Sequence, residues 1–457
     1  MPERDGGKRL TRREFMKAGT ALAGAAAATP WLLGQGPALA ATAGDPMVGA
    51  IPEALLKGSM PAPKFTGEIR IGCIFPRSGV NAYLGEESWR GAKVAIDVIN
   101  AKGGINGKEV KVSIADAPDP SAAVSEAERF ISKEGMKIIT GTTTSFLSYA
   151  VSELTERNRV IMWEEGAFAN SLTARGFKYL FRVCCRSSDA ALTAVQLTKD
   201  GLAPLLKIPT SQLKVAMLHE DSPYGADMGK YAEQYAKEAG IPLLGREAYS
   251  TKSVDLSSVV LKLKGLNPDV LLACQFTPDA ILFWKQAREL AFMPKAMVGT
   301  GAAHSVRDFY NAFGSNADGI FSCDYPQFDQ NPESAPGITE FIQLYRKTYN
   351  EEMRAPHSLV SYTGFSVLWD VLARAGSTDP EAVRKAALET DIPLGKTPIG
   401  WGVKFAPPGD PDQGTNIRAY AVGMQWQEGG KFVTVWPTKI AVGKIKYIPM
   451  TPWSERR

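Results

Sequence analysis

A serine at the start of a predicted helix is the first candidate for ligand chemistry in this chain. Ser145 follows Gly141-Thr-Thr-Thr144 and begins a helical pattern that runs through residues 146–157. Its hydroxyl group and the neighbouring backbone N–H groups would point at an anion, aided by the helix dipole. The alternative is an N-cap that only satisfies the helix end. Arg77, in an earlier loop, could pair a carboxylate through two parallel hydrogen bonds, or remain a solvated side chain.

Residues with the usual spacing of an enzyme site are missing from the sequence. The histidines are His219, His304 and His357, and none has the spacing that a zinc site needs. There is no Gly-x-Ser-x-Gly elbow and no Walker motif. Glu164 and Glu165 are adjacent in a predicted strand, so their side chains point to opposite faces and cannot share a site. The sequence therefore predicts no catalytic residues, no metal and no cofactor.

Short strands and amphipathic helices alternate along the chain and would position the candidate residues. An apolar run over residues 69–75 is followed by a helical face that includes Trp89 and Ile96, and Gly103-Gly104 ends that helix. The alternation continues to about residue 299, which implies right-handed βαβ units and parallel sheets with helices on both faces. The series is too long for one sheet of ordinary size, so two α/β lobes are expected. Ligands in such proteins bind where strands end and helices begin.

The N-terminus has the features of an export signal. Thr11-Arg-Arg-Glu-Phe-Met-Lys17 is a twin-arginine motif, an alanine-rich region follows over residues 18–33, and Ala38-Leu39-Ala40 fits a cleavage site. Residues 1–40 are thus predicted to be a signal peptide, and the mature protein is expected in the periplasm. Removing them lowers the net charge from +4 to about +1. This near-neutral chain gives no argument for nucleic acid, and no later stretch is apolar enough for direct membrane insertion.

The segment that starts at Ala82, AYLGEESWRGAKVAIDVINAKGGINGKEV, closely resembles the periplasmic leucine/isoleucine/valine-binding proteins of ABC importers. The ending VTVWPTKIAVGKIKYIPMTPW is also typical of that family. The resemblance implies a type I periplasmic binding fold, in which two Rossmann-like α/β lobes are joined by a hinge that the chain crosses three times. The expected parts are a leader over 41–65, a first lobe over 66–186 and 322–415, a second lobe over 187–321 and 416–440, and a tail over 441–457.

The resemblance also implies how such a chain would work. It would capture a small-molecule ligand by hinge closure and deliver it to ABC transporter permease subunits in the inner membrane, without catalysing a reaction. A ligand-sensing receptor with the same fold is an open alternative, and a cofactor-binding or enzymatic protein is a weaker one. The ligand-binding positions that the resemblance implies are Tyr83, Ser145, Gly166, Phe168, Tyr224, Phe276 and Gly301.

Three positions depart from the amino-acid-binding pattern of the family. Relatives that take leucine or isoleucine have a threonine in place of Phe168, a tyrosine in place of Phe276, and an acidic partner for the ligand's ammonium near Gly301. Burying an ammonium group without a counter-charge costs several kcal/mol. A closed cleft of this kind would therefore reject zwitterions, unless another acidic residue takes over this role; the candidates are Glu164, Glu165, Glu220 and Asp221.

These departures lead to a hypothesis about the ligand. The pocket is expected to hold a small molecule with a carboxylate or amide and an apolar or aromatic body, with Trp163, Phe168 and Phe276 as aromatic walls. The alternatives are that these aromatic residues belong to the core, and that the ligand is a branched-chain amino acid.

Overall fold

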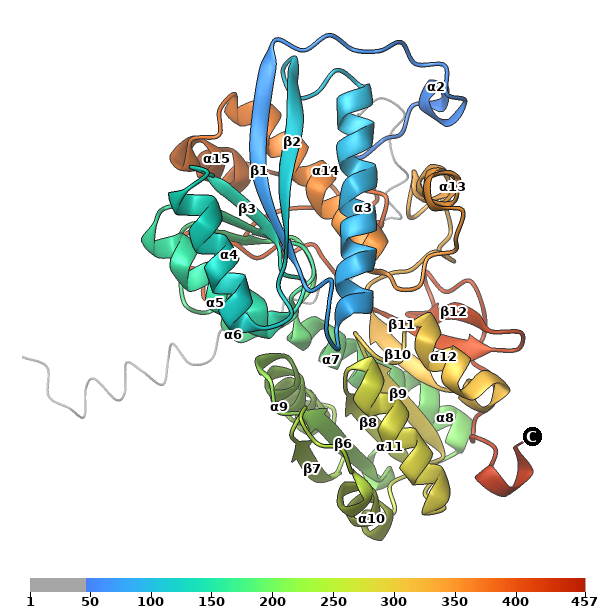
Figure 1. The fold of residues 1–457 in the computed structure, drawn as a ribbon. Helices are drawn as coiled ribbons and strands as arrows, with labels where there is room; N and C mark the ends of the chain where they lie inside the picture. Colours follow the sequence, from blue (N-terminus) through green and yellow to red (C-terminus); the bar gives the residue numbers. More distant parts are fainter. Residues whose placement is uncertain (1–46, 457) are drawn as a thin grey trace, which may run out of the picture. The chain divides into compact units, whose positions relative to one another are not determined.

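The alternation of strands and helices predicted for this chain is present in a computed structural model that describes residues 47–456. The residues of the expected signal peptide lie outside the described part. Two β-sheets are flanked by helices (Figure 1). The strands are β1 Gly67–Phe75, β2 Lys108–Asp116, β3 Ile138–Gly141, β4 Ile161–Glu164, β5 Leu180–Arg182, β6 Val215–Glu220, β7 Leu243–Tyr249, β8 Val270–Cys274, β9 Ala296–Thr300, β10 Phe321–Asp324, β11 Val422–Gln427 and β12 Lys431–Trp436.

Helices connect most of these strands. The α-helices are α2 Glu53–Leu56, α3 Ala82–Ala101, α4 Pro120–Ser132, α5 Ser145–Arg157, α6 Asn170–Thr173, α7 Ser187–Gln196, α8 Ala203–Leu206, α9 Pro223–Glu238, α10 Ser257–Leu266, α11 Thr277–Glu289, α12 Arg307–Phe313, α13 Ile338–Tyr349, α14 His357–Ala375 and α15 Pro380–Leu388. A π-helix over Leu197–Leu202 joins α7 to α8.

The first sheet has the order β2-β1-β3-β4-β5, and all of its strands are parallel. Alternate residues of β1 face opposite layers of helices, as the two-residue period of a strand requires. Cys73 and Phe75 pack in the same core as residues of α3 and α14, whereas Ile74 packs with residues of α4 and α5. The doubly covered parallel sheet that the sequence predicted is therefore confirmed.

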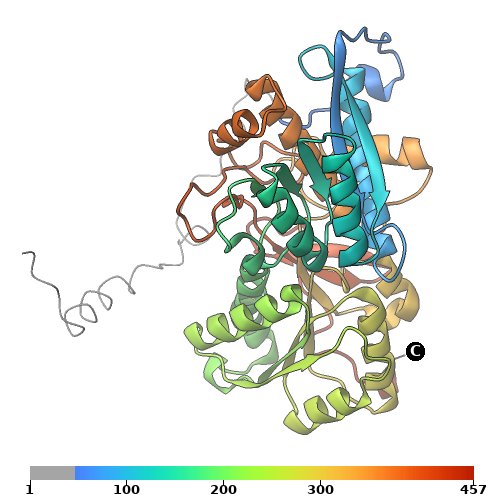
Figure 2. The ribbon, with the colours of Figure 1, turned by 60° about the vertical axis from the view of Figure 1, so that its left-hand side comes forward.

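The second sheet has the order β12-β11-β10-β9-β8-β6-β7. Strands β6 to β10 are parallel, and β11 and β12 are added to β10 in antiparallel pairs. Leu218 packs with residues of α10, α11 and α12, and its neighbour Met217 packs with residues of α7 and α9. Figure 2 shows these helices on both sides of the sheet.

The chain passes between the two sheets three times. It leaves the first sheet after β5, and it leaves the second after β10 to form α13, α14 and α15, of which α14 packs along α3 and α15 contacts β4. It then returns to the second sheet through β11, after a bridge between Arg182 and Thr415. This is the connectivity of the expected type I periplasmic binding fold. Within residues 47–456, no helix has both the length and the apolar character that a membrane span requires.

Candidate functional site

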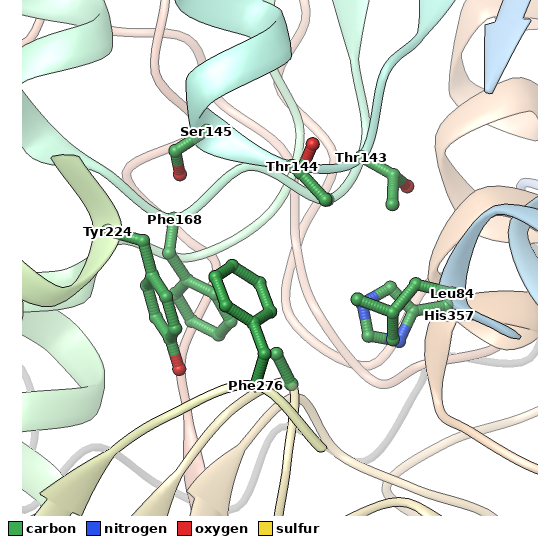
Figure 3. A pocket seen from close by; sticks show the side chains of 10 residues that line it. Leu84, Thr143, Thr144, Ser145, Phe168, Tyr224, Phe276 and His357 are labelled. Atoms are coloured by element: carbon green, nitrogen blue, oxygen red, sulfur yellow. The ribbon is translucent and has the colours of Figure 1, made fainter. Parts of the chain in front are cut away.

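A small cavity lies where parallel strands of both sheets end and their helices begin, the position predicted for a ligand in an α/β protein. Its volume is about 20 Å³, room for about one water molecule. Figure 3 shows the side chains that converge on it. The lining residues are Leu84, Thr143, Thr144, Ser145, Gly166, Phe168, Tyr224, Phe276, Ala302 and His357.

The turn before α5 exposes backbone and hydroxyl donors to this cavity. Gly141, Thr142 and Thr143 have positive φ angles of 98°, 65° and 59°, and such a run in non-glycine residues persists only where the surroundings enforce it. Thr144, not Ser145, is the N-cap residue, and its side chain makes no capping hydrogen bond. The oxygen of Ser145 instead accepts the Ala169 N–H at 3.0 Å, which leaves its O–H free to donate. The N-cap residue of α5 therefore lies one residue earlier than the Ser145 that the sequence suggested.

Glu164 stabilises this turn through hydrogen bonds. Its carboxylate is fully buried and accepts hydrogen bonds from the Thr142 hydroxyl at 2.7 Å, from the Ser148 hydroxyl, and from the N–H groups of Gly166 and Ala167 at 2.7 and 3.0 Å. Burial raises the pKa of Glu164 above its ordinary value, and these donors act in the opposite direction. Glu164 thus positions the turn and is not among the lining residues.

Three aromatic side chains form the apolar side of the cavity (Figure 3). The ring of Phe168 stacks on Tyr224 with a centroid distance of 5.7 Å, and Tyr224 lies 5.7 Å from Phe276. The Tyr224 hydroxyl donates to the carbonyl of Thr300 at 2.8 Å, so the orientation of the ring is fixed. Behind Phe168 lies Tyr325, stacked at 4.6 Å and fully buried.

Trp163 is not part of this wall, which corrects the prediction made from the sequence. Its side chain is fully buried in the core of the first sheet, where its indole N–H donates to the carbonyl of Gly364 at 2.9 Å. It packs against Phe181 and Phe405. Trp163 and Phe168 are five residues apart along the chain, but the strand ends at Glu164 and only Phe168 lies in the loop that reaches the cavity.

Gly301 has no side chain, and this leaves room for the aromatic wall. It has a φ of +46°, and a Cβ atom placed there would lie 2.4 Å from the hydroxyl oxygen of Tyr224 and 3.2 Å from Phe168. No acidic side chain at this position could coexist with the aromatic rings. Gly166 is similarly confined, since a Cβ atom would lie 2.9 Å from the hydroxyl of Thr143.

Tyr83, a predicted ligand-binding residue, does not line the cavity but bridges the two sheets beside it. It lies in the first turn of α3, and its hydroxyl donates to the carbonyl of Ala302 at 2.8 Å and accepts the Thr277 N–H at 3.3 Å. Ala302 and Thr277 follow strands of the second sheet, so the two sheets are bridged here. Arg77 lies elsewhere: its guanidinium pairs with Glu86 at 3.1 Å, and it does not line the cavity.

No carboxylate lines the cavity in the part of the chain that the structure describes. Glu165 is fully buried, and neither of its carboxyl oxygens has a hydrogen-bond partner among residues 47–456. Burial raises the pKa of Glu165 well above its ordinary value. Glu220 accepts the N–H groups of Ser222 and Gly225 in the turn before α9, and Asp221 accepts the Thr251 N–H at 3.1 Å. Of the acids proposed as substitutes for the missing counter-charge, Glu164, Glu220 and Asp221 thus bind backbone or hydroxyl groups of the protein itself, and Glu165 is buried outside the cavity lining.

His357 lines the cavity and was not predicted. It begins α14 and lies nearly edge-on to Tyr325 at 5.6 Å. Burial lowers its pKa to about 3, so the ring is neutral, and its Nδ1 has no hydrogen-bond partner among residues 47–456. Sequence spacing gave no signal for His357, because 189 residues separate it from Phe168 in the same cavity wall.

The buried Asp324 beside this site predicts an unusual pH dependence of stability. Burial raises its pKa to about 7, although it accepts hydrogen bonds from the Ser305 hydroxyl and the Tyr325 N–H. Between the unfolded value near 4 and this value, the folded protein keeps a proton that the unfolded chain releases. The contribution of Asp324 to stability therefore falls as pH rises through that window, by at most about 1.4 kcal/mol per pH unit.

Urea unfolding of the wild type and Asp324→Asn at pH 5 and pH 8 tests this dependence. The variant cannot titrate at this position, so its stability relative to the wild type should increase at pH 8. A difference between the two proteins that is the same at both pH values would contradict the assignment.

Comparisons with known proteins agree with this geometry. The family described as periplasmic binding protein matches residues 68–431. A Leu/Ile/Val-binding protein homolog from Brucella suis is 38% identical over 395 residues, which cover 86% of this chain and 96% of that protein.

Solved structures show the same fold at lower sequence identity. The branched-chain amino acid transporter substrate binding protein of Streptococcus pneumoniae, in complex with isoleucine, has a TM-score of 0.68 and 20% identity over 80% of this chain and 100% of its own. An ABC transporter solute binding protein of R. palustris, in complex with 4-hydroxybenzoate, has a TM-score of 0.68 and 18% identity over 85% of this chain and 99% of its own.

The family match and the curated relative both cover most of the chain, and both are described as binding proteins. The expectation of a non-enzymatic protein is confirmed on that ground. Together with two α/β sheets and a cavity between their strand ends, these matches show that the chain belongs to the periplasmic binding protein family, of the leucine/isoleucine/valine-binding type.

Proposed function

We propose that this protein is the solute-binding component of an ABC importer, exported through its twin-arginine signal, which captures a small organic ligand by closing two lobes around it. The lobes would comprise residues 66–186 with 322–415, and residues 187–321 with 416–440. The observation that carries the proposal is a cavity whose lining comes from the strand ends of both sheets. Permease subunits in the inner membrane would be the partners.

Contacts from both lobes are what closure requires. A ligand shifts an open–closed equilibrium only by its differential affinity for the two states, so it must touch both lobes when they are closed. Thr144 and Ser145 lie at the start of α5, which follows a strand of the first sheet. Tyr224 in α9 and Phe276 before α11 follow strands of the second sheet. The hydrogen bonds of Tyr83 to Ala302 and Thr277 supply further contacts that support a closed arrangement.

The chemistry of the lining favours a ligand without a positive charge. The hydroxyl of Ser145 and the N-terminal N–H groups of α5 suit a carboxylate or an amide oxygen. The rings of Phe168, Tyr224 and Phe276 suit an apolar or aromatic body. An ammonium group would meet no carboxylate there, at a cost of several kcal/mol. The cavity of about 20 Å³ would enlarge by movement of the aromatic rings or of the lobes as the ligand enters.

A branched-chain amino acid is the second candidate ligand. It is favoured by the 38% identical relative that is described as a Leu/Ile/Val-binding protein homolog. The structural neighbour that holds 4-hydroxybenzoate shows that the same fold also accommodates an aromatic acid.

A thermal-shift panel on the mature protein, unfolded and refolded to remove any co-purified ligand, tests the proposal. The panel contains leucine, benzoate-type acids, short amides and fatty acids. A ligand at 100 times its dissociation constant adds about 2.7 kcal/mol, so an acid or amide should raise the melting temperature by about 5 °C. Stabilisation by leucine alone would overturn the preference for an uncharged or anionic ligand, and no stabilisation by any compound would count against solute binding.

A further inference from the structure

A second and much larger hollow lies away from the cavity described above. Its volume is about 770 Å³, within the range of sites for small organic ligands, and it shares no lining residue with the first cavity. Its walls are α13 and the segment before α14 on one side, and α12, β11 and β12 on the other. In Figure 1, α13 lies beside α3, above α12 and β12.

Apolar side chains form the floor of this hollow. Trp426 and Phe432 come from the second sheet, and Met353 comes from the segment that precedes α14. All three are buried, whereas Val442 at the edge is 45% exposed. The floor therefore suits an aliphatic or aromatic body.

The carboxylates at the rim of the hollow already have partners within the protein. Arg346 forms an ion pair with Glu352 at 2.8 Å. Asp329 is directed to the N–H and hydroxyl of Thr434, at 2.6 and 2.9 Å. Both of these carboxylates are thus already engaged by the protein.

Two cations at the rim have no carboxylate partner among residues 47–456. The Arg307 guanidinium donates to the carbonyl of Gly430 at 2.7 Å and lies 5.2 Å above the ring of Trp426. Lys431 is exposed and forms no ion pair in the described part of the chain. The rim therefore offers positive charge directly above an apolar floor.

We propose that this hollow binds an amphipathic anion, a molecule with an apolar or aromatic body and a carboxylate, sulfonate or phosphate head. The body would lie against Phe432, Met353 and Val442, and the head would lie between Arg307 and Lys431. Charge complementarity and burial of apolar surface are the two contributions to its affinity.

The hollow lies between elements that pack on the first sheet and elements that belong to the second. The carbonyl of Arg354, before α14, accepts the N–H of Arg307, at the start of α12, at 2.9 Å, and the guanidinium of Arg354 pairs with Asp308. Because these residues line or adjoin the hollow, an anion bound there contacts elements that pack on both sheets.

Titration of the mature protein with 8-anilinonaphthalene-1-sulfonate, an amphipathic anion that fluoresces in apolar sites, tests the proposal. One saturable site is expected. Lys431→Glu and Val442→Glu should each weaken it about 10-fold, and both positions are exposed, so the fold should be retained. Lys444→Glu is the matched control: it makes the same charge reversal at an exposed lysine outside the lining, and should leave the affinity within about 2-fold.

Competition experiments identify the ligand class. Dodecanoate should displace the dye, whereas dodecanol and sulfate, which carry only the body or only the charge, should be at least about 10-fold weaker. The dye-binding site should persist in Gly301→Ala, which alters only the first cavity, so failure of this proposal and failure of the proposed function are distinguishable. Equal affinities of Lys431→Glu and Lys444→Glu, equal displacement by dodecanol, or no saturable binding would overturn the proposal.

Discussion

Replacement of Gly301 by alanine should lower the affinity of the first cavity for its ligand by about 100-fold. The added methyl group would lie 2.4 Å from the Tyr224 hydroxyl, so this ring must leave its place and its hydrogen bond to Thr300 must break. The positive φ of Gly301 adds about 1 kcal/mol of backbone strain for a residue with a side chain. The strain and the lost hydrogen bond lower the stability of the protein with or without ligand. The affinity falls because the ligand loses its contact with the displaced aromatic wall, which costs about 3 kcal/mol, or about 100-fold.

Isothermal titration with the tightest ligand of the thermal-shift panel measures this effect. Gly240→Ala is the matched control, because Gly240 also has a positive φ, of 69°, but has no atom within 4 Å of the added Cβ position. It should cost stability through strain and leave ligand affinity unchanged. If Gly301→Ala bound the ligand as tightly as Gly240→Ala, Tyr224 would have no role in the site.

Replacement of Gly91 by alanine should destabilise the folded protein by about 3 kcal/mol or more. Gly91 lies in α3 where this helix packs along α14, and a Cβ atom there would lie 1.9 Å from the backbone carbonyl oxygen of Ser358. A backbone atom cannot rotate away as a side chain does, so the two helices would have to separate. Overpacking of this kind costs 1–3 kcal/mol or more, and greatly exceeds the gain of about 1 kcal/mol that alanine brings to a helix.

Urea denaturation followed by circular dichroism measures the loss of stability. Gly265→Ala, within α10, is the control, since nothing lies within 4 Å of its added Cβ. That variant should be as stable as the wild type or more stable by up to about 1 kcal/mol. Equal denaturation midpoints for Gly91→Ala and the wild type would show that α3 and α14 do not pack as closely as described.

Local patterns predicted most of the fold because each βαβ unit is a short stretch of sequence. The strand that ends at Phe75 and the helix that contains Trp89 and Ile96 were found from periodicity and glycine positions alone. The strand β7, Leu243–Tyr249, was missed because it has no continuous apolar run. It lies at the edge of the second sheet, where only alternate residues are partly or fully buried. The short strand β5 gave too few residues for a pattern.

The candidate site was predicted in part. Ser145, Phe168, Tyr224 and Phe276 all line one cavity, although 131 residues separate the first from the last. They follow from one rule, which is that ligand-facing residues occupy the loops after parallel strands. The neighbours Tyr325 and His357 enter only because the chain crosses between the sheets and returns, and no local pattern specifies that contact.

Buried polar residues were the hardest to interpret from sequence. Glu164 was considered as a ligand counter-charge, but its four hydrogen bonds hold the turn before α5. Trp163 was assigned to the aromatic wall, but it lies in the core of the first sheet. Both residues are in a strand of four residues that is buried throughout, so burial pattern could not distinguish a core side chain from one at the cavity.

The central claim is that the first cavity does not accept an ammonium group. Leucine and 4-methylpentanoate share the same carboxylate and the same branched chain, and differ only in that group. Their affinities, measured by titration calorimetry on the same refolded protein, directly compare a ligand that carries an ammonium group with one that does not. Because no carboxylate of residues 47–456 lines this cavity, 4-methylpentanoate is predicted to bind at least about 10-fold more tightly than leucine. Tighter binding of leucine would contradict this and return the protein to the amino-acid binders among its relatives.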